Sequence, residues 1–150
     1  MPYTDISSKE SLGHCMGRTT RAMGKMLQNV FFEAGFNITF EQWTVIVNLT
    51  RLNGQFHQQL ADNTYKDKAS ITRMVDTLQR RGIVKRVPDK KDRLQKKIFL
   101  TDKGSNLYRK LLPLVLKAQK KSAADIRPED LEFCKQILVR IYKNISLNNG

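Results

Sequence analysis

The sequence contains few of the residues from which disulfides, metal sites and catalytic centres are built. It has two cysteines, Cys15 and Cys134, and two histidines, His14 and His57, and the members of each pair lie far apart along the chain. This spacing excludes a disulfide framework and supplies no cluster of metal ligands, although a metal site assembled between subunits remains open. No Ser/His/Asp set, paired-carboxylate array or glycine-rich phosphate loop is visible. We therefore expect no metal, no cofactor and no enzymatic activity.

Long apolar runs are also missing. No stretch approaches the roughly 18 residues that a membrane span needs. Residues 1–11 are polar and lack the apolar centre of a signal peptide. The chain has 150 residues, of which 40% are hydrophobic and 27% are charged, which is typical of one folded domain. We expect a cytoplasmic protein with a single domain over residues 1–150.

Acidic residues are outnumbered. The chain has 27 Lys and Arg against 14 Asp and Glu, a net charge of +13. Residues 66–97 alone hold 12 of these cations against 4 Asp. A basic surface chosen only for solubility is one interpretation. The concentration of charge in one segment favours the other, which is a polyanionic partner and most often a nucleic acid.

Apolar residues at helical spacing predict a mainly helical chain. Thr39 and Gln42 form a capping-box pattern, Thr101 is a candidate cap, and Pro128 occupies a favoured first helical position. The terminal helices carry more apolar surface than a small domain covers, which favours a symmetric dimer. The predicted helices are 8–34, about 41–52, about 55–62, 68–81, 102–121 and a last one that opens at 128 and frays after about 147.

The helix at 68–81 has two distinct faces. Its apolar stripe consists of Ile71, Met74, Val75 and Leu78, and its other side is polar and cationic. Asp67 precedes it as an N-cap, and Gly82 follows it as a stop. With the short helix before it, this segment forms a helix-turn-helix.

Two β-like segments, 83–88 and 95–100, follow this helix and enclose the charged tip 89–94. Such a hairpin after a helix-turn-helix is a wing. The predicted fold class is therefore mainly α with a small β-wing, in which a winged helix-turn-helix (37–101) is flanked by N- and C-terminal dimerisation helices (8–34 and 102–147).

Residues 60–86 and 89–104 resemble the MarR (multiple antibiotic resistance regulator) family. The family pattern is a recognition helix ending Leu-x-x-x-Gly-(Ile/Leu)-(Ile/Val), a wing with Asp-Arg, and a strand ending Leu-Thr-x-x-Gly. Here these are Leu78 to Val84, Asp92-Arg93, and Leu100 to Gly104. The resemblance implies a DNA-binding transcriptional regulator, usually a repressor. It also implies an obligate homodimer that binds a palindromic operator and is controlled by a small ligand or by cysteine oxidation.

The helix at 68–81 is expected to enter the major groove, where base edges are distinguishable. Ser70, Thr72 and Arg73 are the candidate base readers, and Lys68 is expected to meet a phosphate. In the wing, Arg93 is expected to enter the minor groove. The other wing residues expected at the DNA backbone are Lys90, Lys91 and Lys96. Ordinary first-turn polarity and a solvated hairpin tip are the alternatives for the two sets.

The chain departs from the family pattern at two positions. Leu94 stands where a second wing arginine is common, so one charge is missing. Gln55 stands where the short helix usually has a Ser or Thr cap, and we expect that end to be less firmly fixed.

The site of control is less defined. A ligand crevice between the dimer helices and the winged helix would be lined by Met16, Met23, Phe31, Phe36 and Trp43, all of which also suit a plain core. Cys15 lies where a peroxide-sensing branch of the family carries its reactive cysteine. A small buried apolar residue is the favoured interpretation of Cys15, because the activating tyrosines of that branch are missing. A second function class is also open: a winged-helix interaction module whose basic face binds an acidic partner.

Overall fold

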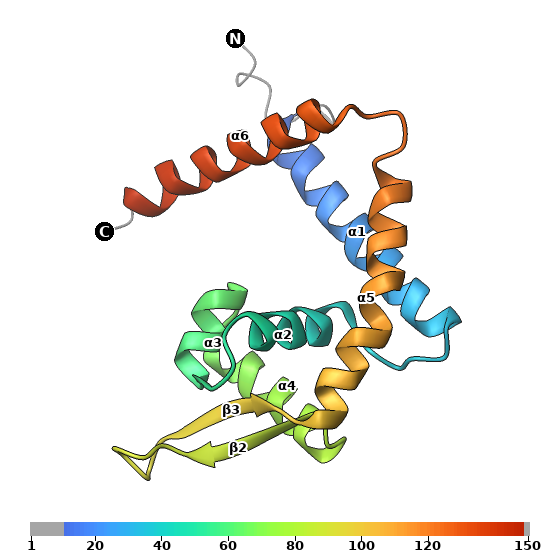
Figure 1. The fold of residues 1–150 in the computed structure, drawn as a ribbon. Helices are drawn as coiled ribbons and strands as arrows, with labels where there is room; N and C mark the ends of the chain where they lie inside the picture. The colour runs from blue at the N-terminus through green and yellow to red at the C-terminus, as the bar shows by residue number, and fades with distance from the viewer. Residues whose placement is uncertain (1–10, 149–150) are drawn as a thin grey trace. The chain divides into compact units, whose positions relative to one another are not determined.

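The structure is a computed structural model that describes residues 11–148. It is mainly helical with one small antiparallel sheet, which confirms the predicted fold class. In chain order the elements are α1 (Leu12–Glu33), α2 (Phe40–Arg51), β1 (Gln55–Phe56), α3 (His57–Thr64), α4 (Lys68–Arg80), β2 (Val84–Pro88), β3 (Lys96–Leu100), α5 (Asp102–Ser122) and α6 (Pro128–Leu147) (Figure 1).

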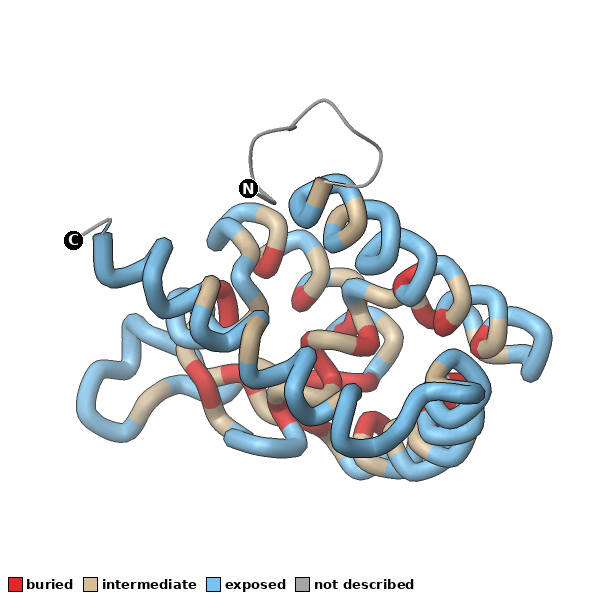
Figure 2. The backbone as a smooth tube through the Cα atoms, turned by 90° about the horizontal axis from the view of Figure 1, so that it is seen from above, coloured by how far each residue is buried: buried red, intermediate tan, exposed pale blue. Residues whose placement is uncertain are grey.

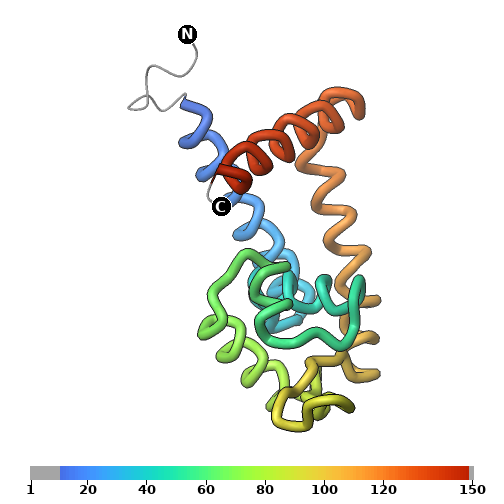
Figure 3. The backbone as a smooth tube through the Cα atoms, turned by 90° about the vertical axis from the view of Figure 1, so that its left-hand side faces the viewer, coloured from blue at the N-terminus to red at the C-terminus, as the bar shows by residue number. Residues whose placement is uncertain are grey.

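The chain divides into two compact units. The first is Met1–Val115, which holds every element from α1 to the first part of α5. The second is Leu116–Gly150, which holds the end of α5 and all of α6. In the first unit α2, α3 and α4 form one cluster, visible as the green segments of Figure 3, and the β2–β3 hairpin leads away from it.

The helix starts are set by local hydrogen bonds, as the sequence predicted. Thr39 and Gln42 form the expected reciprocal capping box of α2, with bonds of 3.1 Å in both directions. The Asp67 carboxylate accepts the backbone N–H of Ser70 at 2.8 Å. Thr101 Oγ1 accepts the N–H of Gly104 at 3.0 Å, and α6 opens on a proline. These bonds satisfy donors that the first turn of a helix leaves free.

One predicted helix boundary is wrong, and another lies outside the described residues. The first helix begins at Leu12, since the Ser11 side chain caps it, and the predicted start at residue 8 lies outside the described residues. The helix predicted from about 55 begins at His57. Residues 55–56 instead form β1, which pairs with β3 in the register Gln55↔Ile98 and Phe56↔Lys97. The sheet therefore has three strands in the order β1-β3-β2.

The core of the first unit lies between the helices and the sheet. It includes three of the four residues of the predicted α4 stripe, Ile71, Val75 and Leu78, while Met74 is half-buried. Leu60 of α3 and Ile98 of β3 are also completely buried. This packing fixes the inner face of α4, so its polar face is directed outward.

The second unit contrasts with the first. No residue of α6 is buried, and in Figure 2 the helix that ends at the C-terminus carries no red. Cys134, predicted to pack on the apolar seam of this helix, is exposed within the single chain. The exposed large apolar residues of α6 are Phe133, Leu138, Val139, Tyr142, Ile145 and Leu147. None of the described helices is both long enough and apolar enough to cross a membrane.

Candidate nucleic-acid interface

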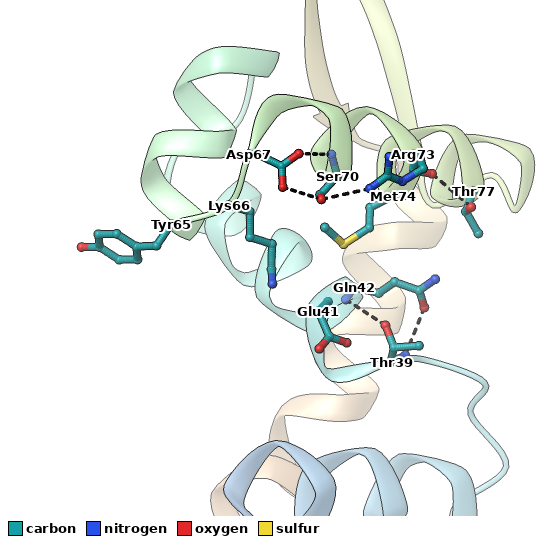
Figure 4. A pocket seen from close by; sticks show the side chains of 10 residues that line it. All are labelled: Thr39, Glu41, Gln42, Tyr65, Lys66, Asp67, Ser70, Arg73, Met74 and Thr77. Atoms are coloured by element: carbon teal, nitrogen blue, oxygen red, sulfur yellow. Dashed lines mark hydrogen bonds between the residues drawn. The ribbon is translucent and has the colours of Figure 1, made fainter. Parts of the chain in front are cut away.

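Three hydrogen-bonded side chains, those of Asp67, Ser70 and Arg73, form a row along the outer face of α4. Ser70 Oγ donates to the Asp67 carboxylate at 2.6 Å, and Arg73 Nη2 donates to Ser70 Oγ at 3.1 Å (Figure 4). The hydrogen bond from the Ser70 hydroxyl is the main reason that the pKa of Asp67 lies below its usual value. Asp67 thus does more than cap the helix: it also holds Ser70, and Ser70 holds the exposed Arg73 guanidinium.

The other two predicted α4 residues lie on the side that faces the wing, which we define as residues 84–100. Lys68 is exposed, and Thr72 Oγ1 donates to the Lys68 carbonyl at 2.9 Å. Both line a groove of about 690 Å³ between α4, the start of α3 and the wing, here called the wing groove. Its lining is Phe56, His57, Gln58, Lys68, Thr72, Arg86, Leu94, Gln95 and Lys96.

Arg86 of β2 connects the recognition helix α4 to the wing and to α3. Its guanidinium donates to Asp76 at 2.6 Å, to Gln79 at 2.5 Å and to His57 Nε2 at 3.3 Å. Because a guanidinium only donates, His57 Nε2 carries no proton in this arrangement. Burial, followed by the charges of Arg86 and Lys68, lowers the pKa of His57. Sequence reasoning did not single out Arg86, Asp76, Gln79 or His57, because only the tertiary fold brings them together.

The wing tip is a tight, internally bonded loop. The Asp89 carboxylate accepts the backbone N–H groups of Lys91 at 3.3 Å and Asp92 at 3.2 Å, and Asp92 Oδ1 accepts the N–H of Leu94 at 3.1 Å. Desolvation opposes ionisation of Asp89, but these backbone bonds and Lys97 lower its pKa overall. Two aspartates thus shape the backbone that carries Arg93.

The predicted wing residues are all at the surface. Lys90, Lys91, Arg93 and Lys96 are exposed, and Lys96 also lines the wing groove. Asp92 Oδ1 accepts the backbone N–H of Leu94, and the Asp92 carbonyl accepts that of Gln95. The structure therefore brings Lys68, Thr72 and Lys96 to one groove, with Arg73 on the α4 face and Arg93 at the tip.

A second cavity, of about 630 Å³, lies on the other side of α4, between the start of α2 and the α3–α4 turn (Figure 4). Met74 directs its thioether toward this space, while Tyr65 points away from it. Tyr65 has a left-handed backbone with φ of 57°, so the turn closes without a glycine. The cavity is lined by two cationic residues, Lys66 and Arg73, and by two acidic residues, Glu41 and Asp67.

The five residues predicted for a ligand crevice do not share one cavity. Phe31 and Trp43 are buried in the core with ring centroids 5.5 Å apart, and Trp43 also stacks on Tyr108. Met16 and Met23 are exposed on α1. Phe36 lines a separate cavity of about 450 Å³. Lys103, which also lines it, donates to the carbonyl of Arg81 at the end of α4.

The two cysteines differ in exposure. Cys15 is partly buried in α1, and Cys134 is exposed on α6. Within residues 11–148 no group of three His, Cys, Asp or Glu side chains is placed to hold a metal ion.

Gln55 is firmly held, contrary to expectation. It is 0% exposed. Its amide donates to the carbonyls of Leu52 at 2.7 Å and Asn48 at 3.2 Å, and it accepts from Asn63 at 2.9 Å. The helix end that a Ser or Thr cap would fix is fixed here by a buried amide, and by Gln59, whose side chain accepts the N–H of Phe56.

A winged helix-turn-helix with an exposed basic recognition helix is the architecture found, and comparison with known proteins agrees. The model of the MarR family matches residues 38–95. The winged helix-turn-helix segment of this chain is similar to that of the MarR family of transcriptional regulators. This result confirms the resemblance drawn from residues 60–86 and 89–104.

A curated relative and two solved structures are similar to this chain over most of its length. The uncharacterized HTH-type transcriptional regulator YybA of Bacillus subtilis (strain 168) is 25% identical over 134 residues, which are 87% of this chain and 85% of YybA. The structure of BpsR from Bordetella bronchiseptica, described as regulated in DNA binding by 6-hydroxynicotinic acid, has a TM-score of 0.81 at 18% identity, over 89% of this chain and 94% of that one.

The regulator PcaV from Streptomyces coelicolor, solved with its natural ligand, has a TM-score of 0.77 at 20% identity, over 95% of this chain and 98% of that one. At these identities the two structures show that the fold is shared. The ligands described for BpsR and PcaV are properties of those two proteins.

Proposed function

We propose that this protein, as a MarR-type regulator, binds a palindromic DNA operator as a homodimer, acts as a repressor, and is released by a small ligand or by oxidation. The observation that carries the proposal is the outward face of α4. Its buried stripe fixes the helix, while Arg73, Ser70 and Thr72 stand on the polar side next to a cationic wing groove. A helix with this exposed face fits the major groove, where Arg73 would bond a guanine bidentately.

The charges around the helix support two backbone contacts. Lys68 and Lys96 lie on opposite walls of the wing groove, which suits a sugar-phosphate strand between α4 and the wing. Arg93, at the exposed tip, would then enter the adjacent minor groove, and Lys90 and Lys91 would meet its phosphates. Each group has the position that a winged helix requires if it reads the two grooves with separate elements.

The exposed apolar surface of α6 supports the homodimer. A helix of 20 residues with none buried in the single chain has a large apolar face open to water. A second copy of the same helix is the simplest cover, because a two-fold interface pairs a surface with itself. Sedimentation equilibrium tests this: the wild-type protein should be a dimer at micromolar concentration, and Phe133→Glu with Ile145→Glu should shift it toward monomer.

The operator is tested by selection of bound sites from random duplex DNA. Wild-type protein should enrich an inverted repeat with half-sites about 10 base pairs apart or a multiple of that. Arg73→Ala should lose roughly ten- to a hundredfold in affinity for the selected duplex and relax the base preference at one position per half-site. Arg109→Ala is the matched control, since Arg109 is exposed on α5 and bonds only Asn106.

Release by a signal is tested in the same assay. Mild peroxide should weaken binding of the wild-type protein if a cysteine is the sensor, and Cys15→Ser should abolish that response. Because Cys134 is more exposed than Cys15, Cys134→Ser has to be tested beside it. If neither variant changes the response, oxidation is removed from the proposal and a small ligand remains.

A protein-interaction module with an acidic partner is the second candidate. The overall charge of +13 supports it, because charge alone does not distinguish polyanions. Competition separates the two functions. Binding to the selected duplex that survives excess nonspecific DNA supports the regulator, and equal binding to any polyanion, including an acidic peptide, supports the module.

A further inference from the structure

Of the wing residues that line the wing groove, Leu94 is the apolar one. Leu94 at the wing tip is 95% exposed, more than any other large apolar residue of the described chain. Beside the ring of Phe56, the groove is lined by polar and cationic residues, including Gln95, Lys96, Lys68 and Thr72. An isolated exposed leucine is ordinary at a protein surface. An exposed leucine that lies on a fixed loop, among the groups proposed to bind phosphate, suggests a specific role.

The backbone at Leu94 is fixed in the free protein. Its N–H donates to Asp92 Oδ1, the next N–H, that of Gln95, donates to the Asp92 carbonyl at 3.0 Å, and the Gln95 carbonyl accepts from Asp89 at 2.8 Å. Three consecutive bonds of this kind close the tip before any ligand arrives. The leucine is therefore held out by the loop, and its backbone need not be ordered on binding.

A DNA strand presents charge and apolar surface in alternation. Each phosphate is followed by a deoxyribose, whose carbon face is apolar. The wing groove has the same alternation: Lys68 and Lys96 supply cations, and Leu94 supplies the apolar surface near them. Apolar side chains at the minor groove are a known means of contact with DNA.

We propose that Leu94 is a DNA-contacting residue that packs on the deoxyribose faces of one strand at the minor groove, beside Arg93. The contact rests on the proposed DNA-binding function and adds a residue to it. It stabilises the complex by removing apolar surface of the leucine and the sugars from water. An arginine, which is more common in the family at this position, would bind DNA through its charge. Leu94 would instead bind it through the hydrophobic effect.

The force is measurable through its salt dependence. Binding of a phosphate by a cation releases counterions, so it contributes about 0.9 to the slope of log K against log salt. An apolar contact contributes nothing to that slope. Truncation of Leu94 should therefore weaken binding equally at every salt concentration.

The test uses the full-length protein and the duplex that wild-type protein selects from random DNA. Leu94→Ala should weaken binding about fivefold with the salt slope unchanged, since part of a leucine side chain is buried on binding. Leu94→Arg should restore or exceed wild-type affinity at low salt and steepen the slope. Leu52→Ala, which truncates another exposed leucine outside the groove, should behave as wild type.

Hydroxyl-radical footprinting supplies a second readout, because hydroxyl radicals abstract hydrogen atoms from deoxyribose in the minor groove. Wild-type protein should protect two or three sugars per half-site that become reactive with Leu94→Ala, while Arg73→Ala, at saturating protein, should keep them protected.

Two results overturn the inference. One is wild-type affinity for Leu94→Ala on a duplex where Arg73→Ala is impaired. The other is a loss of affinity for Leu94→Ala that comes with a reduced salt slope. Failure of the proposed function is distinct: the wild-type protein would then select no duplex at all, and Leu94 would lose its target with it.

Discussion

Arg86 Nη2 on strand β2 donates to Asp76 Oδ1 on the recognition helix at 2.6 Å, and the Arg86 side chain is only 17% exposed. The pair links the wing to α4 across ten residues of sequence. The same guanidinium reaches Gln79 and His57, so three elements meet at one side chain. Arg86 therefore joins α4, the wing and α3 through one side chain.

Replacement of Arg86 by methionine keeps the apolar stem and removes every one of these bonds. We expect the free energy of unfolding to fall by about 1–2 kcal/mol, since charge-assisted bonds are lost while Asp76 stays half-exposed. DNA affinity should fall as well, although Arg86 need not touch DNA. Urea titration checks the first effect. Lys85→Met, one residue earlier and exposed, is the control, and equal destabilisation by both variants would contradict the role given to Arg86.

His57 should make stability depend on pH. Its pKa in the folded protein is lowered from 6.5, so the unfolded chain takes up a proton first as the pH falls. The contribution of His57 to the free energy of unfolding should thus be at its maximum above pH 6.5. It should decline as the pH falls below 6.5, and the decline should end once the pH lies below the pKa of His57 in the folded protein. Thermal melts between pH 7.5 and 5 measure this. His57→Gln should flatten the decline, and His14→Gln, on exposed α1, should leave it in place.

Gln55→Leu should be destabilising despite the gain in hydrophobicity. The substitution would remove the hydrogen bond from the completely buried Gln55 side chain to the carbonyl of Leu52 and the one that it accepts from the amide of Asn63. We expect a loss of about 2–3 kcal/mol in the free energy of unfolding. Gln58→Leu, at an exposed position three residues along, should change it by less than about 0.5 kcal/mol. A stable Gln55→Leu variant would show that these bonds do not fix the start of α3.

Gly104→Ala and Gly13→Ala should have opposite effects. A Cβ on Gly104 would overlap the carbonyl oxygen of Ile83, and backbone cannot move aside as a side chain does. We expect a loss of about 2 kcal/mol or more. A Cβ on Gly13 meets nothing within 4 Å, and alanine favours the helix by roughly 0.5–1 kcal/mol. Chemical denaturation of the two variants side by side gives the comparison.

Arg93→Ala should weaken DNA binding and reduce its dependence on salt. Each phosphate-neutralising charge contributes about 0.9 to the slope, and a dimer would lose one such charge per protomer. Fluorescence anisotropy at four or five salt concentrations measures both quantities. An unchanged affinity and slope would remove the wing tip from the interface, whereas Arg109→Ala should leave both as they are.

Sequence patterns predicted what local chemistry decides. The capping residues Thr39, Asp67 and Thr101 have the contacts expected of them, because a cap acts within three residues. The apolar stripe of α4 placed Ile71, Val75 and Leu78 in the core. Once that stripe was assigned to the core, the remaining residues of α4 were predicted to form its polar, outward face.

Contacts between distant segments could not be predicted in the same way. Strand β1 has two residues, too few to show alternation, and its partners on β3 lie about forty positions later. The Arg86 cluster joins residues separated by 7 to 29 positions. The burial of Gln55 could not be predicted for the same reason, because its side chain turns inward only if residues 55–56 form a strand. The roles of Ser70, Thr72, Arg73 and the wing cations in DNA contact stay predictions.

The order β1-β3-β2 also has a bearing on self-association. Because β1 and β2 flank β3 at Lys97 and Ile98, the most apolar strand of the sheet offers no free hydrogen-bonding edge to another chain at these positions. The outer strand β2 is open, but it carries Lys85 and Arg86 and ends at Pro88, which cannot donate to a neighbour. Charge and proline of this kind discourage strand addition. A highly exposed hairpin can thus extend from the protein without seeding aggregation, which leaves its tip free to carry an apolar residue.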